Sequence, residues 1–315
     1  MKKPFFTIIV VSYNAGDKLV ETVRSITSQT FTDYRVLVKD GMSTDGSVEK
    51  LKKAFKVGTA EEFCASTDDS AGRITLMESC DNGIYHAMNI ATSFLDGKVR
   101  EARASEGDLE EGTEVKILKA GESPSYIFFL NCGDYFRNEN VLRDVHRIIS
   151  DRNRNEGTTL PVIYYGDIFD SSTGNRVASN PRIDDLACYR NVPSHQACFY
   201  DERLIYSNPF DLKYKVRADY EQFLRCFYRE KAETVYMPVL IANYEGGGFS
   251  DKNKKISEQE RREIILMYLP AEKVRKYDFL RAVTLAPLRT AISSNRITAG
   301  AYNGLKSAIY AILKK

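Results

Sequence analysis

Four clusters of polar residues stand out in the sequence because each directly follows an apolar, strand-like stretch. They occupy residues 12–14, 40–46, 78–83 and 131–134. Their hydroxyl, carboxylate and amide groups can bind a base and a ribose, and their glycines allow a ligand to approach the backbone closely. Each cluster alone could simply form a turn, since Asp, Asn, Ser and Gly favour turns for local reasons. Together they predict one nucleotide site, in which a diphosphate would require a divalent cation.

The elements that must position these clusters alternate between strand and helix. Apolar stretches predict strands at residues 5–11, 34–39, 74–78 and 126–131, and helical periodicity predicts helices at 18–28, 47–55 and 84–95. This alternation implies right-handed crossovers and a mostly parallel sheet with helices on both faces. Ligands of such sheets bind at the carboxyl ends of the strands, where all four polar clusters lie.

The second half of the chain has a mixed α+β pattern. We expect a helix at 140–150, a strand at 162–165, a hairpin around 171–175 and a helix at about 219–229. Two polar stretches, at 58–72 and 96–124, are expected to be surface insertions. A run of three glycines is either a flexible linker or, as we favour, a lid that orders over a bound ligand. The run consists of Gly246, Gly247 and Gly248.

Composition limits the class of protein. The 315 residues, 43% apolar and 28% charged, are typical of a globular chain. A formal net charge of +2 argues against a nucleic-acid partner, because such proteins usually carry a strongly basic face. The six cysteines lack CxxC spacing. No apolar stretch is close to the length of about 20 residues that is needed to span a bilayer. We therefore expect a cytoplasmic protein with reduced thiols.

The C-terminal segment, residues 252–315, is the basic end of the molecule, with fourteen Lys or Arg against five Asp or Glu. It is expected to be helical from residue 257, with breaks at Pro270 and Pro287. A helix at 297–313 could pack on its own domain, dock on the anionic inner surface of a membrane, or pair two chains as a homodimer. The sequence leaves these three possibilities open.

Six blocks of residues resemble the family-two inverting glycosyltransferases with the GT-A fold. They are residues 6–14, 38–47, 81–89, 128–136, 193–197 and 218–224, and the last four resemble the branch that acts in capsule, exopolysaccharide and O-antigen assembly. The blocks occur in order over residues 5–250, which is far more specific than one short motif. The resemblance implies a GT-A nucleotide-diphospho-sugar transferase fold: a Rossmann-like, mostly parallel sheet flanked by helices, with a C-terminal helical extension.

The resemblance also implies a division of the chain. Residues 1–250 would form the glycosyltransferase domain, with a donor half at about 1–136 and an acceptor half at about 137–250. Residues 251–315 would form the basic helical extension. The donor nucleotide would contact residues of all four strand ends, with Asp40 accepting from the base and Asp81 bordering the nucleoside pocket. These residues are Ser12, Tyr13, Asn14, Asp40, Gly41, Ser43, Asp81, Asn82, Gly83, Asn131 and Gly133.

A cation site is implied at the end of the fourth strand. Asp134 would be the metal carboxylate for Mn²⁺ or Mg²⁺, since a departing diphosphate develops negative charge that a hard cation stabilises. The family usually has two carboxylates here, whereas Asn131-Cys132-Gly133-Asp134 supplies one. His195 is a second metal-ligand candidate, and it could equally bind phosphate or play a structural part.

Asp219 is the expected catalytic base. It opens a predicted helix, where a carboxylate is also a common N-cap, but the matching aspartate of the family deprotonates the acceptor. Gln196 and the glycines at 246–248 are placed by the resemblance at the lid and acceptor side.

The function that follows is inverting transfer of a hexosyl or N-acetylhexosaminyl group from a nucleotide-diphosphate sugar, with UDP as the default. The acceptor would be a hydroxyl of a glycan or lipid-linked oligosaccharide in bacterial surface polysaccharide biosynthesis.

Two alternatives to this function stay open. One is a catalytically silent GT-A-fold protein that binds nucleotide or glycan, motivated by the missing carboxylate and by His86, where the branch commonly has aspartate. The other is a sugar nucleotidyltransferase, which normally needs a glycine-rich basic phosphate loop after its first strand.

Overall fold

A computed structural model of the chain describes residues 4–58, 74–96, 124–156, 160–246, 253–283 and 304. Most of the two expected insertions, Gly247 and Gly248 of the glycine run, Pro287 and the helix expected at 297–313 lie outside the described residues.

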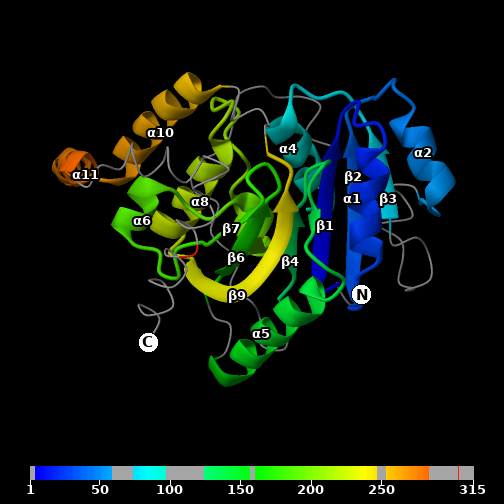
Figure 1. Ribbon diagram of the computed structural model, residues 1–315, viewed down its shortest axis with the longest axis horizontal. Helices are drawn as coiled ribbons and strands as arrows, with labels where there is room; N and C mark the ends of the chain where they lie inside the picture. The colour runs from blue at the N-terminus through cyan, green and yellow to red at the C-terminus, as the bar shows by residue number, and fades with distance from the viewer. Residues whose placement is uncertain are drawn as a thin grey trace.

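The described residues form one sheet of nine strands, in the order β3-β2-β1-β4-β8-β6-β9-β5 with β7 beside β6 (Figure 1). The strands are β1 (Phe6–Ser12), β2 (Tyr34–Asp40), β3 (Ile74–Glu78), β4 (Tyr126–Phe129), β5 (Tyr135–Phe136), β6 (Val162–Asp170), β7 (Asn175–Val177), β8 (Cys198–Asp201) and β9 (Glu233–Tyr244). β1 to β4 pair in parallel, and β6 pairs in parallel with β9. β8, β7 and β5 are antiparallel to their neighbours. The parallel half ends on one edge, which gathers the polar clusters.

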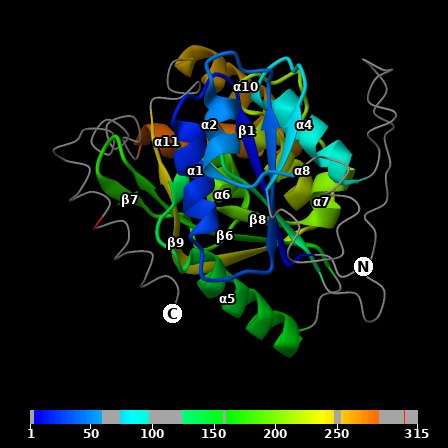
Figure 2. The ribbon, with the colours of Figure 1, turned by 90° about the vertical axis from the view of Figure 1, so that its right-hand side faces the viewer.

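Helices cover both faces of the sheet (Figure 2). One face is covered by α1 (Lys18–Thr27), α2 (Ser47–Ala54) and α5 (Val141–Glu156). The other face is covered by α4 (Ile84–Leu95), α6 (Asp185–Arg190), α7 (Glu202–Ser207), α8 (Ala218–Tyr228) and α10 (Lys254–Tyr268), with α11 (Ala271–Val283) packed on α6 and α10. In β1, Ile8 and Val10 join the core of the first face, and Ile9 and Val11 join the core of the second. Successive side chains of a strand point to opposite faces, so a continuous apolar run is what a doubly covered strand requires.

The expected α/β fold with a mostly parallel sheet and C-terminal helices is confirmed. The strands and helices expected in the first half are present within one or two residues, apart from a shorter β4, and a helix break at Pro270 separates α10 from α11. The sequence reasoning missed β5, β8, α6 and α7, which are short, and it gave no bounds for the 12-residue β9. Within the described part of the chain, no helix combines the length and the apolar character needed to cross a membrane.

Candidate active site

Three strand ends meet at Gly41, which follows β2. A Cβ atom at this position would lie 3.0 Å from Tyr13 Cδ2, after β1, and 3.0 Å from Asp81 Oδ2, after β3. Tyr13 is 68% exposed, so its ring is available to a ligand. The structure therefore brings these three expected donor residues together at the carboxyl edge of the sheet.

Asp40 organises the loop that follows β2. Its Oδ1 accepts from Ser43 N at 2.7 Å and its Oδ2 accepts from Ser43 Oγ at 2.8 Å. Ser43 Oγ also accepts from Asn14 N at 2.8 Å, and Asn14 Oδ1 accepts from Thr44 N at 2.9 Å. Asp40 is fully buried, so a contact between its carboxylate and a base would require this network to rearrange. Its role toward the base stays a prediction.

Lys39 is a site residue that the sequence reasoning missed. It is fully buried, and its Nζ donates to Asp40 O at 3.1 Å, Ser79 O at 2.8 Å and Asp81 Oδ2 at 2.6 Å. Asp81 Oδ1 accepts from Gly83 N at 3.0 Å. A lysine directly after the apolar residues 36–38 of the strand was the available signal, because a buried ammonium needs a partner.

The helix that follows β3 begins with a local contact. Asn82 N donates to His86 Nδ1 at 3.0 Å. His86 thereby accepts a hydrogen bond from the backbone directly before the N-cap of α4, which is a structural role.

Asp134 is a buried residue of the site, with only 4% of its surface exposed. Its Oδ2 accepts from Gln196 Nε2 at 3.0 Å, and its Oδ1 accepts from Glu245 N at 2.9 Å. Burial raises the pKa of Asp134, and these two hydrogen bonds offset the rise only in part. The carboxylate is thus firmly oriented by a second-half side chain and by the end of β9.

Glu245 is the second residue that the sequence reasoning missed. Gly133 has a φ of +99°, and a Cβ atom there would lie 2.4 Å from Glu245 Oε2. The Glu245 carboxylate therefore fills the space that a side chain at position 133 would need. Lys18 Nζ donates to Glu245 Oε1 at 2.5 Å. The available signals were a glycine within the motif where the family has carboxylates and an acid directly before the glycine run.

The described residues contain no group of three or more His, Cys, Asp or Glu side chains that could hold a metal ion by itself. Mg²⁺ in phosphate-handling enzymes is commonly held by one or two carboxylates together with substrate phosphates, and Mn²⁺ favours the same oxygen ligands. Asp134 and Glu245 are the two acids whose residues contact each other at this turn, and cation binding by them stays a prediction.

Asp219 lies in the first turn of α8, with its side chain 29% exposed and so accessible to a substrate. Its Oδ1 accepts from Tyr85 OH at 3.1 Å and from Tyr220 N at 2.9 Å. Its Oδ2 lies 3.2 Å from His195 Nδ1. Burial by itself would raise the pKa of Asp219, but the hydrogen bond from His195, together with the charge of Arg217, lowers it. Asp219 is therefore ionised at neutral pH and can accept a proton.

Both ring nitrogens of His195 are engaged. Nδ1 faces the Asp219 carboxylate, which can only accept, and Nε2 lies 3.1 Å from Asn131 Nδ2, which can only donate. A neutral ring with its proton on Nδ1 satisfies both contacts. Binding of a cation by His195 would require one contact to break, so that role stays a prediction.

Asn131 contributes one further polar atom to this region. Its Oδ1 is buried and has no hydrogen-bond partner among the described residues. Such an atom is costly unless a ligand or a water satisfies it.

One short 3₁₀ helix, His195–Ala197, links the two expected functional aspartates. His195 contacts Asp219 while the next residue, Gln196, donates to Asp134. Asp134, after β4, and Asp219, in α8, therefore belong to one cluster of contacting side chains.

The start of the glycine run lies against the β6–β7 hairpin. Gly246 has a φ of +80°, and a Cβ atom there would lie 2.8 Å from Ser172 Cβ. Glycine is thus required at this position both for the backbone conformation and for the close approach. Closure of a lid stays a prediction.

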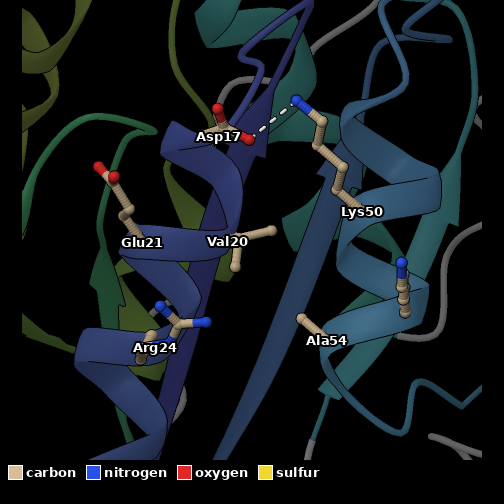
Figure 3. A pocket seen from close by; sticks show the side chains of 7 residues that line it. Asp17, Val20, Glu21, Arg24, Lys50 and Ala54 are labelled. Carbon is tan, nitrogen blue, oxygen red and sulfur yellow. Dashed lines mark hydrogen bonds and ion pairs between the residues drawn. The ribbon is translucent and has the colours of Figure 1, made fainter.

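The outer surface has a groove between α1 and α2, crossed by the Lys50–Asp17 ion pair of 2.8 Å (Figure 3). It is lined by Asp17, Val20, Glu21, Arg24, Lys50, Lys53 and Ala54. None of the expected donor residues lines it, so it is separate from the strand-end site.

The chain is similar in sequence to known glycosyltransferases. Residues 7–99 match the family described as Glycosyl transferase family 2. Two curated relatives are called PGL/p-HBAD biosynthesis glycosyltransferase, one from Mycobacterium bovis (strain BCG / Pasteur 1173P2) and one from Mycobacterium tuberculosis (strain ATCC 25177 / H37Ra). Each is 28% identical to this chain over 253 residues, which is 80% of this chain and 81% of the relative.

Solved structures of S. aureus TarS share the fold. TarS 1-349 has a TM-score of 0.53 and 15% identity, and the match covers 90% of this chain and 73% of TarS 1-349. Its complex with UDP-GlcNAc has the same TM-score at 14% identity, with 85% and 71% covered. This chain spans 43% of the longer TarS chain, at a TM-score of 0.50. Residues 7–99 thus resemble family 2 glycosyltransferases, and the chain has a GT-A-like α/β fold.

Proposed function

We propose that this chain is an inverting glycosyltransferase that binds a nucleotide-diphosphate sugar at the ends of β1 to β4 and an acceptor hydroxyl at Asp219. The observation that carries the proposal is the 3₁₀ helix His195–Ala197, which holds Asp134 and Asp219 through neighbouring side chains. A donor phosphate near the first aspartate and an acceptor hydroxyl near the second would then lie within one site.

Asp219 takes the proton in this reaction. The acceptor oxygen attacks the anomeric carbon, the bond from that carbon to the phosphate oxygen breaks, and the hydroxyl proton moves to the Asp219 carboxylate. The nucleoside diphosphate leaves with the bonding electron pair, and the configuration at the anomeric carbon inverts. Asp219 is a weak base because its pKa is lowered, but proton transfer that accompanies attack does not require a strong base.

Asp134 would hold a divalent cation, Mn²⁺ or Mg²⁺, with Glu245 as the second carboxylate. The cation would supply positive charge to the departing diphosphate. Lys18, which is bonded to Glu245 at 2.5 Å, adds a positive charge at the same turn. Gly133 allows this arrangement because it has no side chain.

The identity of the substrates is a finer part of the proposal. UDP is the first nucleotide to test, since the fold neighbour TarS 1-349 has been solved with UDP and with UDP-GlcNAc. The acceptor is a glycan or a lipid-linked sugar, in keeping with relatives named for PGL/p-HBAD biosynthesis and with the sequence blocks of the polysaccharide-assembly branch. We propose further that the protein is cytoplasmic and makes peripheral contact with the membrane that holds such an acceptor.

The experiment is a transfer assay with UDP-sugars, a sugar or lipid-linked acceptor, and Mn²⁺ or Mg²⁺. The product's anomeric configuration is read by NMR and should be opposite to that of the donor. Asp219→Asn should lower transfer on the order of 1,000-fold, to a residual rate that can still be measured, but retain UDP binding. Asp211→Asn, in an exposed turn where Asp211 accepts from Lys213 N at 2.9 Å, is the matched control and should stay active. UDP binding without transfer or donor hydrolysis, across all donors, would favour the silent nucleotide-binding alternative.

A further inference from the structure

The C-terminal helix α10 contacts the loop that carries Asp219. Glu260, on α10, accepts hydrogen bonds from three successive backbone N–H groups of this loop. Its Oε1 accepts from Lys215 N at 2.9 Å, and its Oε2 accepts from Val216 N at 3.0 Å and Arg217 N at 2.9 Å. A carboxylate that accepts several backbone N–H bonds forms strong, charge-assisted contacts. Residues 215–217 are therefore held in one conformation directly before the helix of the expected base.

The opposite side of the same loop contacts the active site. Tyr85 OH lies 2.9 Å from Val216 O and 3.1 Å from Asp219 Oδ1. Within the described part of the chain, Arg217 at the N-cap of α8 makes no side-chain hydrogen bond to the helix. The start of α8 is thus fixed from outside, by Tyr85 on one side and by Glu260 on the other.

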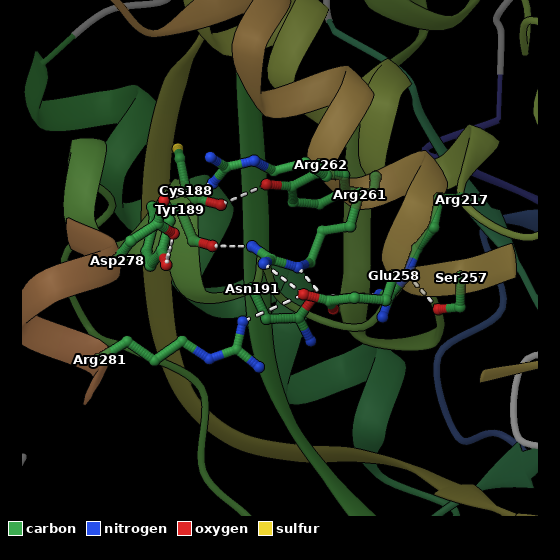
Figure 4. Close-up of polar contacts among 11 residues, drawn as sticks. Cys188, Tyr189, Asn191, Arg217, Ser257, Glu258, Arg261, Arg262, Asp278 and Arg281 are labelled. Carbon is green, nitrogen blue, oxygen red and sulfur yellow. Dashed lines mark hydrogen bonds and ion pairs between the residues drawn. The ribbon is translucent and has the colours of Figure 1, made fainter. Parts of the chain in front are cut away.

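Helix α10 contacts both the core and α6, and Figure 4 shows Arg261 of α10 directed at Tyr189 of α6. Ile264 and Ile265 are fully buried in the core that also contains Tyr85 and Tyr220. Arg261 donates to Tyr189 O at 2.7 Å. Side chains one turn apart in α10 are therefore anchored to the core and to α6, so the position of Glu260 is well defined.

A second contact ties the same loop to α10. Arg217 Nε donates to Ser257 Oγ at 2.8 Å, and Ser257 is 5% exposed (Figure 4). This contact places the guanidinium of Arg217, whose charge helps to keep Asp219 ionised. Helix α10 therefore fixes both the backbone of this loop and the position of a charged group that acts on Asp219.

We propose that Glu260 is a positioning residue for the base: its carboxylate sets the path of residues 215–217 and so fixes where Asp219 faces the acceptor. This inference rests on the proposed role of Asp219. It assigns part of the catalytic machinery to α10, a helix beyond the region that the sequence blocks cover.

The informative variant is Glu260→Gln. The amide keeps one acceptor oxygen but replaces the other by an NH₂ group, which cannot accept, so at least one loop N–H loses its partner. The matched control is Glu263→Gln, one turn further along α10. Glu263 pairs with the exposed Lys213 Nζ and lies 3.3 Å from the hydroxyl of the buried Tyr214, so its described contacts are to side chains and not to the backbone N–H groups of residues 215–217.

Three measurements on the full chain test the proposal: kcat and KM for transfer, UDP affinity by calorimetry, and hydrogen exchange of the amides of residues 215–217. Glu260→Gln should lower kcat on the order of 100-fold, as expected for a misplaced catalytic group, with UDP affinity unchanged. Exchange at the three amides should become faster. Glu263→Gln should match wild type in all three. Faster exchange with an unchanged kcat would overturn the proposal, and so would unchanged exchange.

A double variant separates positioning from general damage. If Glu260 acts through Asp219, adding Glu260→Gln to Asp219→Asn should lower residual transfer no further, because coupled residues are not additive. A further drop equal to the single-variant effect would overturn the proposal. If the wild-type chain transferred no sugar at all, the proposed function would fail, while the exchange measurement would still test the contact between Glu260 and the loop.

Discussion

Gly133 and Glu245 share one space: the Glu245 carboxylate lies where a side chain on Gly133 would be, 2.4 Å from the position of its Cβ atom. The two residues are far apart in the sequence, one after β4 and the other after β9. The absence of a side chain in the first thus allows a carboxylate from the second to lie at the turn that carries Asp134.

Gly133→Ala should therefore disturb the cation site. The methyl group must displace Glu245, and a φ of +99° adds backbone strain of about 1–3 kcal/mol. We expect a lower melting temperature and a loss of Mn²⁺-dependent UDP affinity, both measurable by thermal shift and calorimetry. Gly174→Ala is the control, since Gly174 has a φ of +72° with nothing within 4 Å of its Cβ position. Equal loss of UDP affinity in both variants would show that strain alone is responsible.

Gly41→Ala tests the convergence of the first three strand ends. Gly41 has no positive φ, so the added methyl group acts only by crowding Tyr13 and Asp81, each 3.0 Å from it. We expect UDP affinity to fall about tenfold, about 1.4 kcal/mol, with a small change in stability. Calorimetric titration with UDP measures this directly. Unchanged affinity would place the nucleotide away from this edge.

His195→Gln should change the pH dependence of transfer. His195 helps to lower the pKa of Asp219, so its removal lets that pKa rise. The ionised base is then lost at a higher pH, and the acidic limb of the kcat profile should move upward in pH. His146→Gln is the control, because His146 packs against Phe5 and Phe31 on the other face of the sheet. An unshifted limb with a lowered kcat would assign His195 a purely steric role.

Glu258 gives a prediction about stability. Hydrogen bonds from Arg261 and Arg281, together with their charges, outweigh burial and lower its pKa to about 2 (Figure 4). A carboxylate whose folded-state pKa is depressed stabilises the fold above its ordinary value of 4.5 and loses this effect as pH falls toward 2. Because Glu258 is half exposed, we expect Glu258→Gln to cost only about 1 kcal/mol at pH 7. Melting curves should converge with wild type on acidification; a gap that stays constant to pH 2 would contradict this assignment.

The sequence alone determined the α/β alternation and the position of the polar clusters. The reason is local: apolar runs of β-branched residues followed by helical periodicity specify strand and helix without any distant partner. Because parallel strands present their carboxyl ends on one edge, the meeting of Tyr13, Gly41 and Asp81 could also be predicted. Asp134 and Asp219 were identified through the resemblance, since an aspartate in a turn or at a helix start has ordinary structural explanations.

Only the tertiary structure revealed which distant groups act on these residues. Glu245 beside Gly133, Gln196 on Asp134 and Glu260 on residues 215–217 all join segments far apart in the chain. In the sequence, Lys39 is only a charged residue near the end of a strand. Its hydrogen-bond partners are known only once β2 and the turn after β3 lie side by side in the fold. Hydrogen bonds and ion pairs depend on positions to within fractions of an ångström, and packing of the whole chain, which no local pattern encodes, sets those positions.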